Sequence, residues 1–308
     1  MSSKMLAYII KRILLSIVTI FLIITITFFV MNAIPGGPFL AEKSPSPEVV
    51  KAMEAKYGLD KPIGVRYLTY LKGVVQFDFG PSIKNRGQQC SDIIWRGFLV
   101  SAKLGLTAAL LAIVVGVTCG SIAAVKRDKF GDKFIQVFST AFVAMPSFIV
   151  ASILLICFCV KLPWFPANGA TAGGLVLPVI TLSLYPMSYI TRLQRSSMLD
   201  VLGQDYIRTA RAKGVSKNKV LFKHALKNSL IPVITYAGPM IAYILTGSLV
   251  VEKIFSVNGL GRAFVTSITN RDYPMVMATT IFLATLVIAM NLITDILYKV
   301  VDPRIDFN

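Results

Sequence analysis

The stretch "ILLSIVTIFLIITITFFVMNAI", Ile13–Ile34, contains 22 consecutive residues without a charged side chain. A helix of about 20 apolar residues is long enough to cross the hydrocarbon core of a membrane. Lys4, Lys11 and Arg12 precede the stretch, as basic residues precede the apolar region of a secretory signal. In a cleaved signal peptide that region is usually only about 7–15 residues long. We therefore interpret Ile13–Ile34 as an uncleaved signal anchor and the first membrane-spanning helix.

The composition of the whole chain is also typical of a membrane protein. Of its 308 residues, 55% are hydrophobic and 15% are charged, and the mean hydropathy is +0.69. Soluble domains carry about 25% charged residues. The formal net charge of +17 then has a specific meaning, because the Lys and Arg residues of membrane proteins gather on the cytoplasmic side beside anionic lipids. Nucleic acid is the other common partner of so basic a chain, but it rarely accompanies this much apolar sequence.

Further apolar stretches predict more spanning helices, so we expect an all-α, polytopic membrane bundle with six transmembrane helices. The other five are Leu104–Val125, Phe134–Val160, Leu175–Ile190, Leu230–Val251 and Val276–Val300. The fourth span is short and carries Pro178 and Pro186, and proline usually kinks a helix. Kinked helices suit a protein that changes shape, although proline is also generally enriched in membrane helices. Gly116 and Gly120 have the small-residue spacing of closely packed helices, and we expect them to pack within the chain.

The basic residues set the orientation of these helices. Lys126–Lys133 contains four basic residues and residues 192–229 contain nine, and both fall on the same side of a six-helix chain as the N-terminus. The positive-inside rule places this side in the cytoplasm, so an N-in/C-in arrangement is expected. The expected division is a cytoplasmic tail with the first helix at 1–34, an extracytoplasmic loop or small helical domain at 35–97, and a five-helix membrane core at 98–308 with a cytoplasmic loop at 192–229.

The expected outer loop carries helix signals of its own. Ser46 is suited to cap a helix that has Pro47 at its first position. Gly58 is placed to end that helix, and a second helix is expected to start near Pro62. A small outer domain suits the binding of a partner and equally suits a lid over the bundle, so both roles stay open.

Several kinds of chemistry lack the residues they need. Only Cys90 of the four cysteines lies in a polar loop, so no disulfide framework or cysteine metal site is expected. His224 is the single histidine, and no G-x-x-x-x-G-K-[ST] motif is present to hold phosphates. Apart from Asp295, no Asp, Glu, Arg or His lies deep in an expected span, whereas ion-coupled carriers usually need such groups. We expect no catalytic, cofactor or metal site, and any transport would draw its energy from elsewhere.

A basic segment, "DYIRTARAKGVSKNKVLFKHALKN" (Asp205–Asn228), separates the fourth and fifth expected spans. Its first part is compatible with a helix up to Lys213, Gly214 fits the positive-φ position beyond the helix end, and Ser216 can cap a second helix. The second helix is expected to carry a basic stripe beside an apolar one, formed by Lys219, Lys223 and Lys227 and by Phe222, Leu226 and Leu230.

Three interpretations of the basic segment compete. A DNA-binding helix-turn-helix is disfavoured, because both ends return to the membrane within a few residues. A passive lipid-binding loop fits the charge. A docking element for a cytoplasmic protein that drives conformational change also fits, and it explains a rigid turn fixed by a glycine.

The basic segment resembles the "EAA" loop of permease subunits in bacterial ABC importers, whose signature is E-A-A, three residues and Gly, then Ile-x-Leu-Pro. Arg208-Thr209-Ala210 stands at the E-A-A position and Gly214 at the glycine, while His224, Leu226 and Lys227 stand at the Ile, Leu and Pro positions. With these departures, the segment resembles the peptide-importer branch of the family, whose loop tends to read "DYIRTARAKG" followed by "HALKNSLIPV". Other stretches that resemble the B-type permease of oligopeptide importers are "IPGGPF" (Ile34–Phe39), "YGLDKP" (Tyr57–Pro62), "DFGPSIK" (Asp78–Lys84), "VEKIFSVNGLGR" (Val251–Arg262), "SITNRDYP" (Ser267–Pro274) and "VDPRI" (Val301–Ile305).

The resemblance implies a type I ABC importer permease fold in the bacterial cytoplasmic membrane. The chain would pair with a homologous second permease and form half of a translocation path for a peptide substrate. Two ATPase subunits would hold ATP and Mg, an extracytoplasmic peptide-binding protein would deliver the substrate, and this chain itself would bind membrane lipid but no cofactor and no nucleic acid. The residues implied in coupling to an ATPase are Asp205, Arg208, Thr209, Ala210, Arg211, Ala212, Lys213, Gly214, Val215, His224 and Leu226.

Alternatives remain for the substrate and for the class of protein. Related systems for dipeptides, nickel or some sugars share much of the pattern, so the substrate is open among them. A stand-alone secondary carrier or channel is the next class, and the absence of a buried charge network argues against it. A membrane-anchored sensor or assembly factor is the third, and the recurring prolines and the loop pattern argue against that.

Overall fold

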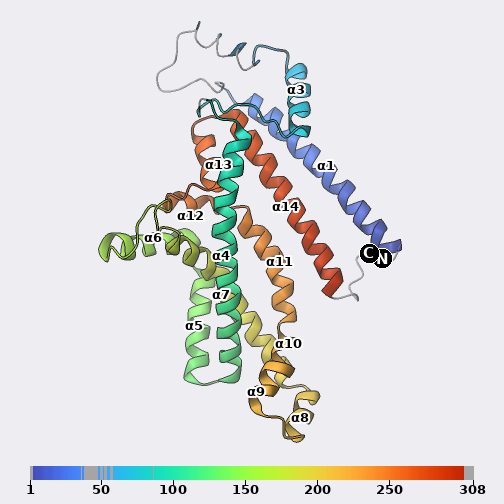
Figure 1. Ribbon diagram of the computed structural model, residues 1–308, viewed down its shortest axis with the longest axis vertical. Helices are drawn as coiled ribbons and strands as arrows, with labels where there is room; N and C mark the ends of the chain where they lie inside the picture. Colours follow the sequence, from blue (N-terminus) through green and yellow to red (C-terminus); the bar gives the residue numbers. More distant parts are fainter. Residues whose placement is uncertain are drawn as a thin grey trace. The chain divides into compact units, whose positions relative to one another are not determined.

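The computed structural model describes residues 3–35, 37, 48, 51, 54–55, 58–85 and 87–301 (Figure 1). These residues are all-α apart from one isolated bridge between Pro81 and Gln89. Packing divides the chain into two units, Met1–Leu99 with Gly259–Leu292 and Val100–Asn258 with Ile293–Asn308. The expected helix cap at Ser46 and the stretch after Val301 lie outside the described residues.

The helices are α1 (Ser3–Ala33), α3 (Ile63–Val75), α4 (Cys90–Val125), α5 (Phe130–Ala144), α6 (Ser147–Leu155), the π-helical turn η1 (Ile156–Lys161), α7 (Val176–Leu202), α8 (Asp205–Ala212), α9 (Lys217–Lys219), the π-helical turn η2 (Val220–Ala225), α10 (Leu226–Ser229), α11 (Ile231–Leu245), α12 (Leu249–Ile254), α13 (Leu260–Thr269) and α14 (Tyr273–Val301).

The first unit packs α3 against α1 through aromatic side chains. The ring of Phe28 lies 5.3 Å from the ring of Tyr67 and 5.5 Å from that of Tyr70, and the Tyr67 hydroxyl is 2.7 Å from the Thr25 hydroxyl. As expected, α3 begins directly after Pro62, whose fixed φ suits a helix start.

Buried polar and sulfur groups organise the rest of the first unit. Asp272 is buried, and its carboxylate accepts a hydrogen bond from the Ser82 hydroxyl and from the backbone N–H groups of Ile83 and Lys84. Cys90 is also fully buried, in an apolar cluster with residues such as Leu260. The expectation that Cys90 lies in a polar loop was wrong, because α4 already begins at this residue and carries its side chain into that cluster.

The second unit is built on a close contact between α4 and α7. A Cβ placed on Gly120 would lie 2.5 Å from the carbonyl oxygen of Thr191, and one on Gly116 would lie 2.8 Å from that of Met187. Only glycine permits so close an approach of two helix backbones. The prediction that Gly116 and Gly120 pack within the chain is therefore confirmed.

Two of the expected spans are interrupted. The third is not one helix, because α5 and the helix formed by α6 and η1 meet at an angle of 105°. Pro146 causes the break: it lacks a backbone N–H and forces the preceding Met145 out of the helical conformation, to φ −83° and ψ 127°. The fifth also ends early, at Leu245, since Gly247 has a φ of +84° and Ser248 caps α12 by accepting a hydrogen bond from a backbone N–H.

Three of the described helices are long and apolar enough to cross a membrane, and the number rises to five if each of two bent helix pairs counts as one span. The three are Ile10–Ala33, Cys90–Val125 and Tyr273–Thr294. α7 is not among them, although its 27 residues extend over about 40 Å at 1.5 Å per residue. The reason is composition, because α7 buries polar side chains such as Thr181, Ser183 and Gln194 inside the unit.

Candidate functional site

The basic segment folds into four short helical elements, α8, α9, η2 and α10, at one end of the second unit (Figure 1). α8 begins at Asp205, whose negative charge is favourable at a helix N-terminus. It ends where Gly214 adopts a φ of +76°. The Gly214 N–H donates to the carbonyl of Arg211 at 3.0 Å, and the Val215 N–H donates to that of Ala210 at 3.2 Å. The positive φ predicted for Gly214 is confirmed, and it turns the chain sharply between α8 and α9.

The basic segment is anchored by a small apolar cluster. Ile207 of α8 is fully buried beside Val220 and Ala225 of η2, together with Met198 of α7 and Ala124 of α4. Burial of these side chains fixes the segment onto the ends of two long helices, because burying one large apolar side chain stabilises by about 1.5–3 kcal/mol.

Hydrogen bonds support the same anchoring. The Asn228 side chain donates to the Tyr206 hydroxyl at 2.9 Å, which joins the end of the segment to α8. The next residue, Ser229, receives a hydrogen bond from the buried amide of Gln194 on α7, also at 2.9 Å. The segment is thus connected to α7 by both polar and apolar contacts.

The residues predicted to couple to an ATPase divide into two groups. Ala210, Val215, His224 and Leu226 are half-buried. The remaining seven are exposed: Asp205, Arg208, Thr209, Arg211, Ala212, Lys213 and Gly214. The predicted coupling residues therefore include some that pack against the rest of the unit and others that are accessible to a partner.

The exposed side of the basic segment is strongly positive. Its exposed basic side chains are Arg208, Arg211, Lys213, Lys217, Lys219, Lys223 and Lys227. One contact is an ion pair in which Arg208 and Asp205 approach to 3.6 Å, but both side chains are largely exposed and such pairs add little stability. A surface of this kind favours an acidic partner and accelerates encounter with it.

Two predictions about the second half of the segment were wrong. Ser216 stands at the position before α9, but its side chain accepts no capping hydrogen bond. The buried residues are Val220, Ala225 and Ser229, whereas Phe222, predicted in the apolar stripe, is 65% exposed. The cause is the π-helical turn η2, which inserts an extra residue and rotates the faces of the helix away from the spacing of an α-helix.

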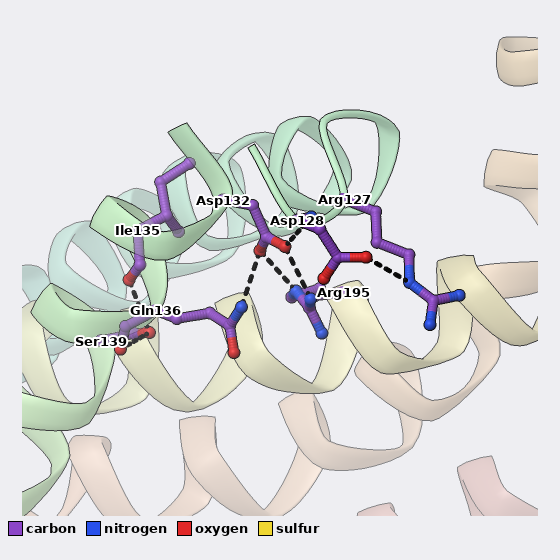
Figure 2. Close-up of polar contacts among 7 residues, drawn as sticks. All are labelled: Arg127, Asp128, Asp132, Ile135, Gln136, Ser139 and Arg195. Carbon is purple, nitrogen blue, oxygen red and sulfur yellow. Dashed lines mark hydrogen bonds and ion pairs between the residues drawn. The ribbon is translucent and has the colours of Figure 1, made fainter. Parts of the chain in front are cut away.

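An ion pair near the basic segment was not predicted from the sequence. Figure 2 shows the side chains of Arg195 on α7 and Gln136 on α5 pointing toward the carboxylate of Asp132. Arg195 Nε and Nη2 donate to Asp132 Oδ1 and Oδ2 at 2.6 and 2.7 Å. Asp132 also accepts from Gln136 at 2.9 Å and from the backbone N–H of Asp128 at 2.9 Å. The Asp132 side chain is only 1% exposed, so all of its bonding capacity is used inside the protein.

The sequence contains only a weak signal for this pair. Arg195 and Asp132 are 63 positions apart, and each is one of several charges in a polar stretch that was treated as solvated. Glu252 lies directly after the expected fifth span, yet it is fully buried and accepts a hydrogen bond from Ser101 at 2.7 Å. Within the part of the chain that the structure describes, no three His, Cys, Asp or Glu side chains are grouped to hold a metal ion.

Comparison with known proteins places the chain in a family of inner-membrane transport components. A family model described as binding-protein-dependent transport system inner membrane component matches residues 116–307, and its N-terminal counterpart matches residues 5–92. A crystal structure of an amino acid ABC transporter with histidines superposes with a TM-score of 0.54, covering 68% of this chain and 94% of that one. At 13% identity, this likeness concerns the fold alone.

Curated relatives narrow the family. The chain is 44% identical to the oligopeptide transport system permease protein OppB of Haemophilus influenzae, over 98% of this chain and all of the relative. It is 46% identical to the dipeptide transport system permease protein DppB of Bacillus subtilis, over 97% of each chain. The chain therefore belongs to the oligopeptide and dipeptide permease family of ABC importers, whose members are membrane subunits and not ATPases.

Proposed function

We propose that this chain forms half of the translocation path of an ABC importer for peptides, together with a second, homologous permease subunit. Its relatives from Haemophilus influenzae and Bacillus subtilis are named as oligopeptide and dipeptide permeases, and they match over almost the full chain. The paucity of ionisable groups deep in the expected spans supports an energy source outside the chain.

The proposed topology has six spans with both termini in the cytoplasm. The spans are α1, α4, the bent pair of α5 with α6 and η1, α7, α11 and α14. This count includes α7, whose polar side chains face other helices of its unit, so that a modest hydropathy does not prevent it from crossing the membrane. Residues 192–229 then lie in the cytoplasm, and residues 35–97 lie outside it as an extracytoplasmic domain.

The basic segment is the proposed docking element for one of two ATPase subunits. The observation that carries this role is its construction: α8 is held by the buried Ile207, ended by the positive-φ Gly214, and surrounded by exposed basic side chains. Such an element is rigid enough to pass a movement of the ATPase on to the membrane helices, whereas a flexible loop would change its own conformation instead. The partner ATPases bind ATP with Mg, and the hydrolysis of ATP there supplies the energy.

Transport follows from a shift between two conformations. Closure of the ATPase pair on ATP moves the basic segment, and the interrupted helices change the membrane path from inward-open to outward-open. An extracytoplasmic peptide-binding protein delivers the peptide, and hydrolysis resets the permease. The ATPase shifts this equilibrium only if it contacts the basic segment differently in the two conformations.

Purification from native membranes is the first test. The tagged chain is extracted in mild detergent, and its companions are identified by mass spectrometry. We expect a homologous permease and two ATPases, and the recovered complex should import peptide into proteoliposomes only with ATP and the binding protein. Recovery of the chain alone, with uptake driven by an ion gradient, would refute the proposal in favour of a secondary carrier.

Peptide length is a second question, because both oligopeptide and dipeptide permeases are among the similar proteins. Competition of radiolabelled uptake by unlabelled peptides of two to six residues separates the two substrates. Inhibition by dipeptides alone assigns the dipeptide branch, and inhibition that strengthens with length assigns the oligopeptide branch.

A further inference from the structure

Two consecutive residues of α7, Gln194 and Arg195, hydrogen-bond to three other helices. Consecutive side chains on an α-helix point about 100° apart, so two residues in one turn of α7 can hydrogen-bond to different helices. Gln194 donates to Ser229 at 2.9 Å, directly after the basic segment, and lies 3.2 Å from Ser121 on α4. Arg195 binds Asp132 in the first turn of α5.

The part of α7 that carries these residues is rigidly joined to α4. Gly120 of α4 leaves no room for a Cβ, which would come within 2.8 Å of Gln194 Cβ and 3.1 Å of Arg195 N. Because protein interiors are close-packed, α4 and α7 move here as one body. The basic segment is attached to this body through Ile207 and Met198, and α5 is attached to it through Asp132.

The attachment of α5 has unusually narrow geometry. Arg195 binds both carboxylate oxygens of Asp132 with two short hydrogen bonds. Such a bidentate pair fixes the orientation of the two side chains, whereas apolar contacts do not. Asp132 is buried, so sliding α5 along α7 would leave an unpaired charge inside the protein. Apolar surfaces alone would permit a slide, because the hydrophobic effect has no direction.

The rest of α5 is arranged to move with this attachment. Asp132, Gln136 and Ser139 form its polar face toward α7 (Figure 2), whereas Phe130, Phe134 and Phe138 form an exposed aromatic row on the other face. The far end of α5 meets the break at Pro146. α5 is thus held at one end by an ion pair and ends at a bend on the other.

We propose that Arg195 and Asp132 are positioning residues that transmit movement of the basic segment to α5 and so set how much transport each ATP cycle produces. This inference rests on the proposed function, because it assigns a link between the ATPase dock and the membrane helices. The basic segment moves α7, the ion pair carries α5 with it, and the chain bends at Pro146. Without the pair, α7 moves while α5 lags behind.

The test compares ATP hydrolysis with uptake in proteoliposomes that contain the whole complex. Asp132→Asn leaves the half-buried Arg195 without its counter-charge, and Arg195→Gln leaves the buried Asp132 without its own. The double variant Asp132→Asn/Arg195→Gln removes both charges and restores neutrality. Arg195→Lys keeps the positive charge but cannot make the two parallel hydrogen bonds of the guanidinium group. Asp200→Asn is the matched control, because this carboxylate also lies on α7 but is exposed.

We expect the double variant and Arg195→Lys to assemble, to hydrolyse ATP at close to the wild-type rate and to import about tenfold less peptide per ATP. Asp200→Asn should match the wild type in both measurements. Wild-type uptake per ATP in the double variant, or in Arg195→Lys if the double variant fails to assemble, would overturn the inference. A proportional loss of hydrolysis and uptake would also overturn it, because that is the result of a purely structural pair. The proposed function fails separately, if the wild-type complex itself shows no ATP-dependent uptake.

Discussion

The positions of Gly120 and Gly214 both favour glycine, but for opposite physical reasons. Gly120 lies where α4 meets α7, and a Cβ there would lie 2.5 Å from the carbonyl oxygen of Thr191. Gly214 lies at the end of α8, where a Cβ would meet nothing within 4 Å and only the φ of +76° disfavours most other residues. One position is limited by space and the other by backbone conformation.

The difference shows how the α4–α7 contact and the basic segment obtain their stiffness. The α4–α7 contact is stiff because its volume is filled, so any added atom strains both helices. The basic segment is stiff because a turn fixes its path and a few buried side chains attach it, while its outer surface stays free for a partner. A change in the first should disturb assembly, and a change in the second should disturb coupling.

Of the four substitutions predicted here, Ile207→Ala should have the largest effect. It tests whether the basic segment can lose its order while the α4–α7 contact stays intact. Deleting part of a fully buried isoleucine costs about 2–5 kcal/mol, and here the loss falls on the attachment of α8. We expect rapid tryptic cleavage within the segment, which is rich in exposed Lys and Arg, and loss of uptake while the complex remains assembled. The same truncation at Ile231, which is 49% exposed, is the control.

Gly120→Ala should destabilise the α4–α7 contact by about 1–3 kcal/mol through overpacking. The measurement is the midpoint of thermal unfolding of the detergent-solubilised complex, which should fall. Gly131→Ala is matched to it, because a Cβ at Gly131 would meet only the Lys126 side chain at an ordinary 3.5 Å. Equal midpoints for the two variants would contradict a contact limited by space.

Gly214→Val should cost about 1–2 kcal/mol, the strain of a left-handed conformation, and this strain falls entirely on the turn. We expect normal membrane insertion and assembly but impaired uptake. Gly214→Asn, which adopts positive φ more readily, should retain most of the uptake. Wild-type uptake by the valine variant would remove the case for a fixed turn.

Arg208→Gln should have the smallest effect on stability, below about 0.5 kcal/mol, because its ion pair with Asp205 is exposed. If the segment docks on an acidic surface, the substitution should instead slow association with the ATPase, most clearly at low salt. Surface plasmon resonance of the purified permease pair with its ATPase measures this rate. Lys129→Gln, an exposed charge outside the basic segment, should leave it unchanged.

Local chemistry made much of this fold predictable. All of the apolar run at Ile13–Ile34 except its last residue lies in α1, Pro62 precedes α3, and Gly214 has the positive φ that its neighbours require. In each case the deciding interaction lies within a few residues, so the sequence pattern carries it. The exposed side of the basic segment was predictable for the same reason, since its charges are concentrated in one stretch.

Features that depend on distant partners were not predictable from one sequence. Nothing near Asp132 indicates that Arg195, 63 residues away, will bind it, and nothing near Cys90 indicates the cluster that buries it. The π-helical turn η2 also escaped prediction, because Val220 and Ala225 are buried by tertiary packing in a cluster with Ile207 and Met198. Helix faces follow α-helical spacing until tertiary packing favours another path.

The burial of Cys90 has a practical consequence for spectroscopy. Cys90 is inaccessible, and the other three cysteines, Cys119, Cys157 and Cys159, are half-buried on helices assigned to the membrane. Polar thiol reagents react with thiolates that are open to water. A single cysteine introduced at the exposed Lys217 would thus carry a spin label or fluorophore almost alone, without removal of the native thiols. Movement of the basic segment during an ATP cycle then becomes a change in the mobility or fluorescence of the label that can be followed in an otherwise unaltered chain.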